Sequence, residues 1–434
     1  MVKTECGIFG IISISSLTNH RLISGLKDLQ HRGRDSFGFS YYDEGIKIVK
    51  CQGLVHHKQV LKMSNVWLGH VRYSTSTKMM KYCQPIYSTD KKFSIVHNGN
   101  IKESIWEKFD FLHDRYDSDT YKLMLLIQDR IIEGYSLEEA LKYIIDNIEG
   151  SFCIVIHTKD NLYILRDRFG IKPLSYLANE NRLIITSEAQ NKNYQHFDPG
   201  SVYRLEVKDL NLTKLYQREE KKKRCSFELV YFMKQNTYFD EENVSEWRQR
   251  IAGKLWEQSK ELFQNFKKEE TFVCGVPSSG IVYGEEFAKL SNLPYEQFLK
   301  KKKDYPFRTF ILEDNTKRVG ACEKKYFIDS NIVNKKLIIL DDSVVRGNTM
   351  RFLVAYLKKF QPKEIHLISG SPLIISPCHY GVDFPDIEEL IATKMNLEEM
   401  RRYFKLDSLT FLDVENLKPN DSYCDGCFTG KYMF

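Results

Sequence analysis

Lys335-Lys-Leu-Ile-Ile-Leu-Asp-Asp-Ser-Val-Val-Arg-Gly-Asn-Thr349 is the stretch that decides the fold of the second half of this 434-residue chain. Its apolar, β-branched run Leu337 to Leu340 predicts a buried central strand of a parallel sheet. From Met350 to Phe360 the apolar residues return with helical spacing. The stretch therefore predicts a strand, a polar loop and a helix in succession.

The polar loop between that strand and that helix has the residues of a phosphate site. Asp341 and Asp342, at the carboxyl end of the strand, can face a ribose diol or Mg²⁺. The loop from Ser343 to Thr349 offers backbone N–H groups, hydroxyls and the positive end of a helix to a phosphate. Gly347 lets the backbone come close, and Asn348 or Thr349 can cap the helix. Acidic pairs and Ser/Gly turns after strands are often only solvated, but nine such residues in a row favour a ligand site.

Length and composition limit the classes of protein. The chain is long enough for two domains, its net charge is +6, and 42% of its residues are hydrophobic. This charge argues weakly for nucleic acid and better for small anionic substrates. No apolar window reaches the length of a membrane span and no signal peptide is evident, so we expect a cytoplasmic protein. Ten cysteines then indicate reduced thiols, ligands or a nucleophile.

Asp341 to Thr349 resembles the fingerprint of type I phosphoribosyltransferases, which bind 5-phosphoribosyl 1-diphosphate (PRPP). The wording Asp-Asp-Ser-Val-Val-Arg-Gly looks most like the glutamine PRPP amidotransferase (amidophosphoribosyltransferase) family of purine synthesis. The resemblance implies that the two acids hold the ribose hydroxyls and that the loop holds the 5-phosphate. The implied PRPP residues of this stretch are Asp341, Asp342, Ser343, Arg346, Gly347, Asn348 and Thr349. The family usually has two threonines after the Gly, and the first is Asn348 here.

Near the N-terminus, Cys6 precedes an apolar, strand-like run. As an internal residue its thiol would have no evident base, and a small buried cysteine would be the simpler interpretation. If the Glu5–Cys6 bond were cut, Cys6 would gain an α-amine with a pKa of roughly 7.7 to 8.0, suited to take the thiol proton.

A series of segments after Cys6 resembles the N-terminal-nucleophile (class II) glutamine amidotransferase domain. The resemblance makes Cys6 the nucleophile, freed by removal of a five-residue propeptide, with Asn98 and Gly99 as the oxyanion hole. Arg72, with Thr75, would bind the α-carboxylate of glutamine, and Asp119 its α-ammonium group. The segments are Gly69–Thr75, Gln84–Pro85, His97–Asn100, Asp117–Thr120, Gly150–Phe152 and Arg166–Pro173.

Two further segments resemble the PRPP-binding parts of the same family. Thr271 to Gly280 is a second strand and loop, in which Ser279 matches a hydroxyl that helps Asp341 and Asp342 hold Mg²⁺. Ser278 stands where the family usually has Asp, which should weaken a metal or diphosphate contact. Arg308, in a segment like the family's mobile loop, is expected to meet the diphosphate, with Lys302 or Lys303 as possible additions.

Four cysteines require a common explanation. Cys424-x-x-Cys427 alone could be a redox pair, half a zinc site or chance. With Cys225 and Cys378 it matches the four ligands of the iron–sulfur branch of the family, the branch that also carries a propeptide. Four thiolates suit [4Fe–4S] or Zn²⁺, and spacing does not choose between them. The resemblance favours a structural [4Fe–4S] cluster.

The expected fold is an α+β N-terminal-nucleophile sandwich of four αββα layers, followed by an α/β type I phosphoribosyltransferase domain with a parallel sheet. The expected division is a propeptide 1–5, a glutaminase domain 6–218, a linker 219–226, a transferase domain 227–410 and a C-terminal segment 411–434 with cluster cysteines. Apolar spacing predicts helices near 118–133 and 137–148 and one of about 25 residues from Glu241. Strands are expected around 7–14, 93–97, 152–157, 162–166, 183–187 and 202–206.

The resemblance implies an amidophosphoribosyltransferase that moves the amide nitrogen of glutamine to PRPP, giving 5-phosphoribosylamine, glutamate and diphosphate. It also implies Mg²⁺, feedback inhibition by purine nucleotides and a homo-oligomer, a dimer or tetramer, without nucleic acid or membrane partners. Another class II amidotransferase would share the first half, but the Asp341 to Thr349 loop argues against it. A PRPP-sensing regulator would fit the second half and leave Cys6, Arg72, Asn98 and Asp119 unexplained.

Overall fold

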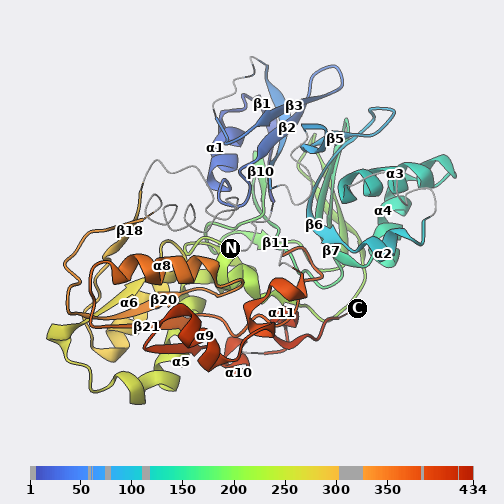
Figure 1. The fold of residues 1–434 in the computed structure, drawn as a ribbon. Helices are drawn as coiled ribbons and strands as arrows, with labels where there is room; N and C mark the ends of the chain where they lie inside the picture. The colour runs from blue at the N-terminus through green and yellow to red at the C-terminus, as the bar shows by residue number, and fades with distance from the viewer. Residues whose placement is uncertain are drawn as a thin grey trace.

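The computed structural model has two lobes that follow one another along the chain, one blue to green and one yellow to red in Figure 1. It describes residues 6–56, 60, 62–73, 80–109, 118–302, 326–382, 386–418 and 420–433.

The first lobe contains two antiparallel sheets. The seven-stranded sheet has the order β11-β9-β10-β1-β4-β2-β3 and the six-stranded sheet the order β13-β12-β8-β7-β6-β5. The first sheet consists of β1 (Gly7–Leu17), β2 (Ser36–Tyr42), β3 (Ile46–Gln52), β4 (Ser64–Arg72), β9 (Ser175–Asn179), β10 (Arg182–Thr186) and β11 (Gln195–His196). The second consists of β5 (Ile86–Tyr87), β6 (Ser94–Ile101), β7 (Gly150–His157), β8 (Asn161–Arg166), β12 (Ser201–Glu206) and β13 (Leu212–Gln217).

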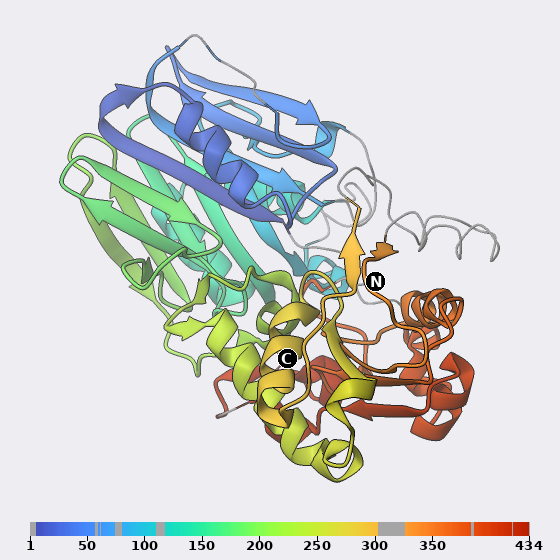
Figure 2. The ribbon, with the colours of Figure 1, turned by 90° about the vertical axis from the view of Figure 1, so that its left-hand side faces the viewer.

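Helices cover the outer faces of these sheets, as Figures 1 and 2 show. Helix α1 (His20–Asp28) packs on β1 and β4, while α3 (Asp119–Ile132) and α4 (Leu137–Asn147) pack on the other sheet. Between the sheets lies a core of aliphatic residues, including Ile8, Val96 and Val155. Burial on both faces explains why β7 has the continuous apolar run Phe152 to Ile156 instead of an alternating pattern. The four αββα layers expected from the resemblance are confirmed. Short elements complete the lobe: η1 (Met80–Tyr82) and α2 (Glu103–Trp106).

The second lobe is built on a four-stranded parallel sheet with the order β17-β20-β21-β22. Strand β20 (Lys336–Asp341) is the predicted central strand, and its interior residues Leu337 to Leu340 are buried. Its neighbours are β17 (Thr271–Gly275), β21 (Glu364–Ser369) and β22 (Ser408–Phe411). The helices are α5 (Val244–Phe263), α6 (Gly280–Ser291), α8 (Asn348–Lys358), α9 (Leu397–Phe404), α10 (Val414–Leu417) and α11 (Gly426–Thr429).

A short mixed region joins the lobes. Strand β14 (Arg224–Cys225) pairs in parallel with β23 (Tyr423–Cys424), so the last residues return to the junction. A π-helical turn, η2 (Glu228–Phe232), follows β14. The remaining elements are β15 (Tyr238–Phe239), β16 (Glu242–Asn243), η3 (Lys268–Glu270), β18 (Leu299–Lys301), β19 (Tyr326–Ile328), η4 (Ile387–Glu389) and η5 (Ile391–Thr393).

Three expectations about local structure need correction. The long helix begins at Val244, not Glu241, because β15 and β16 form a hairpin and the Asn243 side chain then caps α5 by accepting from Glu246 N at 3.1 Å. The cap of α8 is Gly347, and neither Asn348 nor Thr349 is its N-cap. Lys221 to Arg224 is a run of four basic residues in the expected linker, and such runs are usually solvated. Arg224 is instead buried, with its guanidinium 4.4 Å from the ring centre of Tyr423.

The helices of the described residues include none long and apolar enough to cross a membrane.

Candidate functional site

Cys6 lies immediately before β1, where the end of β4 brings Arg72 and Tyr73 beside it. Gly7 pairs with Val71, and the Cys6 thiol lies 3.9 Å from the carbonyl oxygen of Tyr73. The Cys6 side chain is half-buried. The antiparallel pairing of β1 with β4 therefore places the predicted nucleophile and the predicted carboxylate-binding arginine at one end of the first sheet.

Strand β6 brings the predicted oxyanion hole to the same end. His70, which pairs with Ile8, donates from Nε2 to the carbonyl oxygen of His97 at 3.1 Å, across the two sheets. Burial lowers the pKa of both His70 and His97 to about 3, so both rings are neutral at pH 7. This contact fixes β6 directly before Asn98 and Gly99.

Asn98 has the features of a donor without a protein partner. Its residue is 1% exposed, and its Nδ2 makes no hydrogen bond within the described part of the chain. A buried donor of this kind is costly unless a ligand satisfies it. At Gly99 a Cβ would lie 2.0 Å from the carbonyl oxygen of Ser151, so only glycine fits this strand pairing. Both residues suit the role that the sequence predicts for them.

Asp119 starts α3 and lies beside the same strand. Its Oδ2 accepts from Ile101 N at 3.0 Å and its Oδ1 from Trp106 Nε1 at 3.2 Å. These bonds fix the carboxylate two residues beyond Gly99. Cys6, Arg72, Asn98, Gly99 and Asp119 are thus assembled around the ends of β1, β4 and β6, while Thr75 lies outside the described residues.

The second predicted site forms at the carboxyl edge of the parallel sheet. The pairing of Gly275 with Leu340 puts the loops after β17 and β20 side by side. Ser279 donates a short hydrogen bond to Asp342 Oδ2, and Ser343 donates to Asp342 Oδ1 at 2.6 Å. The structure therefore brings together the hydroxyl and the carboxylates predicted for PRPP and Mg²⁺.

In the predicted phosphate loop, the backbone conformation requires Gly347, whereas the side chain of Arg346 is partly engaged by another residue. Gly347 has φ +73°, and a Cβ there would lie 2.5 Å from Ile391, so the loop requires glycine. Arg346 donates from Nε to Glu389 Oε2 at 2.6 Å, which occupies part of its guanidinium. Lys301, which the sequence motifs did not single out, donates to Ser278 at 3.1 Å. Arg308 and Lys303 lie outside the described residues.

The four predicted cluster cysteines meet at the junction of the lobes. Cys225 pairs with Cys424 in the β14–β23 ladder, and the backbone carbonyl of Cys427 accepts from Ser376 N, two residues from Cys378. Burial raises the pKa of the Cys427 thiol well above its ordinary value, and the other three cysteines raise it further. The thiols of Cys225, Cys378 and Cys424 thus all lie within electrostatic range of Cys427.

The closeness of these thiols does not by itself give a metal-binding geometry. Within the ranges that the structure describes, no group of three or more His, Cys, Asp or Glu side chains is arranged to hold a metal ion. The donor types nevertheless match the groups expected: four soft thiols at one position, and hard carboxylate and hydroxyl oxygens at the other.

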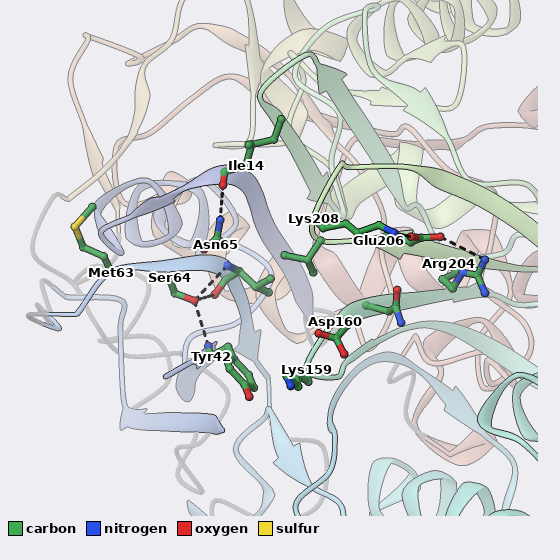
Figure 3. Close-up of a pocket in the computed structure, with 13 residues that line it drawn as sticks. Ile14, Tyr42, Met63, Ser64, Asn65, Lys159, Asp160, Arg204, Glu206 and Lys208 are labelled. Atoms are coloured by element: carbon green, nitrogen blue, oxygen red, sulfur yellow. Dashed lines mark hydrogen bonds and ion pairs between the residues drawn. The ribbon is translucent and has the colours of Figure 1, made fainter. Parts of the chain in front are cut away.

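A separate pocket of about 730 Å³ lies at the far end of β1 from Cys6 (Figure 3). Three of the charged side chains that line it form ion pairs, Lys208 with Glu206 at 3.1 Å and Arg204 with Glu138 at 2.8 Å. Because none of the predicted site residues lines it, we assign it no part in the chemistry.

The comparisons with known proteins agree with this pair of sites. A family model described as a glutamine amidotransferase domain matches residues 70–191. The chain is 30% identical to the amidophosphoribosyltransferase of Methanothermobacter thermautotrophicus, covering 99% of this chain and 95% of that protein. It is also 30% identical to the Bacillus subtilis amidophosphoribosyltransferase, with 99% and 94% covered. The chain belongs to the amidophosphoribosyltransferase family.

A solved structure supports the same family. It is the glutamine PRPP amidotransferase of B. subtilis complexed with ADP and GMP, similar with a TM-score of 0.84 and 28% identity over 98% of this chain and 97% of that chain. As an amidophosphoribosyltransferase the chain is a glutamine-dependent pentosyltransferase, so the enzyme class expected from its motifs is confirmed.

One residue in contact with Cys6 was not predicted from the sequence. Arg32, fully buried, donates from Nε to the carbonyl oxygen of Cys6 at 3.0 Å. The available signal was the charged run His31-Arg-Gly-Arg-Asp35 between two apolar segments. Such runs usually lie on the surface, so the signal was weak.

Proposed function

We propose that this chain hydrolyses glutamine at Cys6 and passes the ammonia to PRPP, giving 5-phosphoribosylamine, glutamate and diphosphate in purine synthesis. The observation that carries the proposal is the assembly of Cys6, Arg72, Asn98, Gly99 and Asp119 in a chain whose second half has a phosphate loop after Asp341 and Asp342.

In the glutaminase step, the Cys6 thiol attacks the amide carbon of glutamine, ammonia leaves, and water hydrolyses the resulting thioester to glutamate. The α-amine of Cys6, free once residues 1–5 are removed, accepts the thiol proton. Asn98 Nδ2 and the Gly99 N–H donate to the oxygen of the tetrahedral intermediate. Arg72 and Thr75 hold the α-carboxylate of glutamine, and Asp119 holds its α-ammonium group.

In the transfer step, ammonia attacks C1 of PRPP and diphosphate leaves. Asp341 and Asp342 hold the ribose hydroxyls, while Ser343 to Thr349 hold the 5-phosphate with backbone N–H groups and hydroxyls. Ser279, Asp341 and Asp342 would hold Mg²⁺, which neutralises diphosphate charge when bound. Arg308 also acts on that charge.

The four cysteines Cys225, Cys378, Cys424 and Cys427 would hold a [4Fe–4S] cluster that fixes the junction. Cys378→Ser should lower iron, acid-labile sulfide and the brown absorbance together, and should lower the melting temperature. The buried Cys274→Ser is the matched control and should change none of the metal readouts. If anaerobically prepared protein contained zinc and no iron, the four cysteines would be assigned to a zinc site and the [4Fe–4S] assignment would be wrong.

Several finer properties belong to the same proposal. Purine nucleotides are proposed as feedback inhibitors, supported by the relative solved with ADP and GMP, and inhibition by either nucleotide is a direct test. The domain limits 6–218 and 227–410, the homo-oligomer and the cytoplasmic location are retained from the sequence as predictions.

The first test measures glutamate and diphosphate release by anaerobically prepared protein, with glutamine and Mg²⁺, with and without PRPP. Intact mass is measured in parallel. Matched release of both products with PRPP, from a chain that begins at Cys6, is expected. A processed chain that releases neither product would overturn the proposal in favour of a regulator.

A further inference from the structure

A buried cation links the backbone of Cys6 to two carboxylates from distant parts of the chain. Arg32 donates from Nε to the Cys6 carbonyl oxygen at 3.0 Å. Its Nη1 donates to Glu188 at 2.8 Å, and its Nη2 donates to Glu228 at 2.8 Å. The three side chains are at most 2% exposed. Glu228 lies 196 residues from Arg32, so tertiary structure alone brings them together.

Glu228 is held by the second half of the chain. It begins η2, and the buried Arg248 of α5 donates to the carbonyl oxygens of Leu229 at 2.8 Å and Met233 at 2.9 Å. The hydroxyl of Tyr283, on α6, donates to the carbonyl oxygen of Val230 at 3.3 Å. These bonds fix a π-helical turn, a rare type of turn that is often found at functional positions.

The same supports lie close to the PRPP loop. Burial raises the pKa of the Tyr283 hydroxyl, and the charges of Asp342 and Asp341 raise it further. Burial lowers the pKa of Arg248, although Tyr283, Asp342 and Glu188 act in the opposite direction. Arg248 thus lies within electrostatic range of Glu188, which pairs with Arg32, and of Asp342 in the predicted PRPP site. The turn η2 is therefore braced between the nucleophile and the ribose-binding acids.

We propose that Glu228 is a positioning residue for the glutaminase reaction, because it fixes Arg32 and Arg32 fixes the carbonyl group of Cys6. This inference rests on the proposed role of Cys6 as nucleophile. The thiol and the α-amine of Cys6 share one Cα with that carbonyl, so holding the carbonyl sets where both reacting groups point. The hydrogen bonds that hold Cys6 in place therefore depend on Glu228, which belongs to the segment that leads into the transferase half.

The test is Glu228→Gln, which removes the charge but keeps an oxygen that can accept from Arg32. The turnover number for glutamine hydrolysis should fall by about 10- to 100-fold with little change in KM, because a small misplacement of a reacting group has effects of that size. The rate of Cys6 alkylation by iodoacetamide should fall, and its pH profile should shift. Diphosphate release with ammonium chloride in place of glutamine should stay unchanged.

Asp240→Asn is the matched control. Asp240 is also buried at the junction and pairs with the buried Arg166 of the first half at 3.1 Å, but this pair does not contact Cys6. Both variants remove a buried charge, so a general loss of stability affects both, and only Glu228→Gln should slow glutamine hydrolysis. Equal turnover in the two variants would overturn the inference.

Two further measurements separate the possible failures. If Glu228→Gln does not fold, Arg32→Lys is tested in its place, because lysine keeps the charge but cannot contact several partners at once as a guanidinium does. Normal turnover in Arg32→Lys would equally overturn the inference. If the processed wild-type chain does not hydrolyse glutamine at all, the proposed function fails first, before Glu228 is in question.

Discussion

The two halves of the molecule differ in how their site residues are distributed along the sequence. In the first half, site residues come from the ends of β1, β4 and β6 and from the start of α3, and buried hydrogen bonds such as His70 to His97 hold these elements together. In the second half, most site residues belong to one loop after β20. The first site depends on the register of two sheets, whereas the second depends on one strand and one loop.

The difference implies separate vulnerabilities. Damage to Cys6 should stop one reaction and leave the other, since ammonia from solution can replace ammonia from glutamine. Damage to the loop after β20 should stop transfer from either nitrogen source. Variants of the two halves can therefore be compared by supplying each nitrogen source in turn.

The largest expected effect is that of Cys6→Ala. We expect complete loss of glutamine hydrolysis and retention of residues 1–5, because the proposed mechanism uses the Cys6 thiol for both reactions. Diphosphate release with ammonium chloride should persist. Cys51→Ala, which removes a buried thiol from β3 of the same sheet, is the control and should keep both activities. Glutamate release by the Cys6→Ala protein, measured by mass spectrometry, would contradict the assignment of the nucleophile.

The next largest effect is expected for Asp342→Asn. Losing a carboxylate that we propose holds the ribose should lower diphosphate release by on the order of 100-fold with either nitrogen source. Glutamine hydrolysis without PRPP should stay within about twofold of the wild-type rate.

A carboxylate at the opposite edge of the same sheet provides the control for Asp342→Asn. Asp407 precedes β22 and accepts from Ile365 N at 2.8 Å, so Asp407→Asn tests damage to the sheet without damage to the loop. If both variants lost transfer equally, the loop would not be the site, and the contrast between the halves would fail.

The same contrast explains what the sequence could predict. Residues 335–349 carry strand, loop and helix signals in sequence order, so β20, α8 and the loop between them followed from local patterns. The helices α3 and α4 were similarly predictable, and α4 carries a capping box between Ser136 and Glu139.

Features that depend on tertiary contacts could not be read in this way. Strands β2 and β3 were not predicted, because β2 is placed by its pairing with β4, and β3 by its pairing with β2, and not by a strong local signal. Arg32 was missed because its carboxylate partners lie 156 and 196 residues away. The assembly of the first site could be predicted only from the resemblance to a known family. The loop after β20 could be predicted from the physical chemistry of its own residues.

The last effect that we expect concerns stability in mild acid, and the loss of stability should be greater in the first half. His70, His97 and His157 are buried there, and burial lowers the pKa of each to about 3 from 6.5. In the unfolded chain these rings gain protons near pH 6.5, while in the folded chain they stay neutral until about pH 3. The free energy of unfolding should therefore fall as pH falls from 6.5 toward 3, by a few kcal/mol per histidine at most.

Hydrogen exchange at pH 7 and pH 4.5, corrected for the intrinsic pH dependence of exchange, compares the two halves directly. Protection should fall more in β4, β6 and β7 than in β20 and β21, where His366 also has a lowered pKa but keeps Glu364 as a partner at 3.0 Å. His157→Gln should reduce the acid sensitivity of the first half, because a side chain that does not titrate removes one proton-uptake site from the unfolded chain. Equal loss of protection in both halves, or an unchanged response in His157→Gln, would mean that buried histidines do not set the difference.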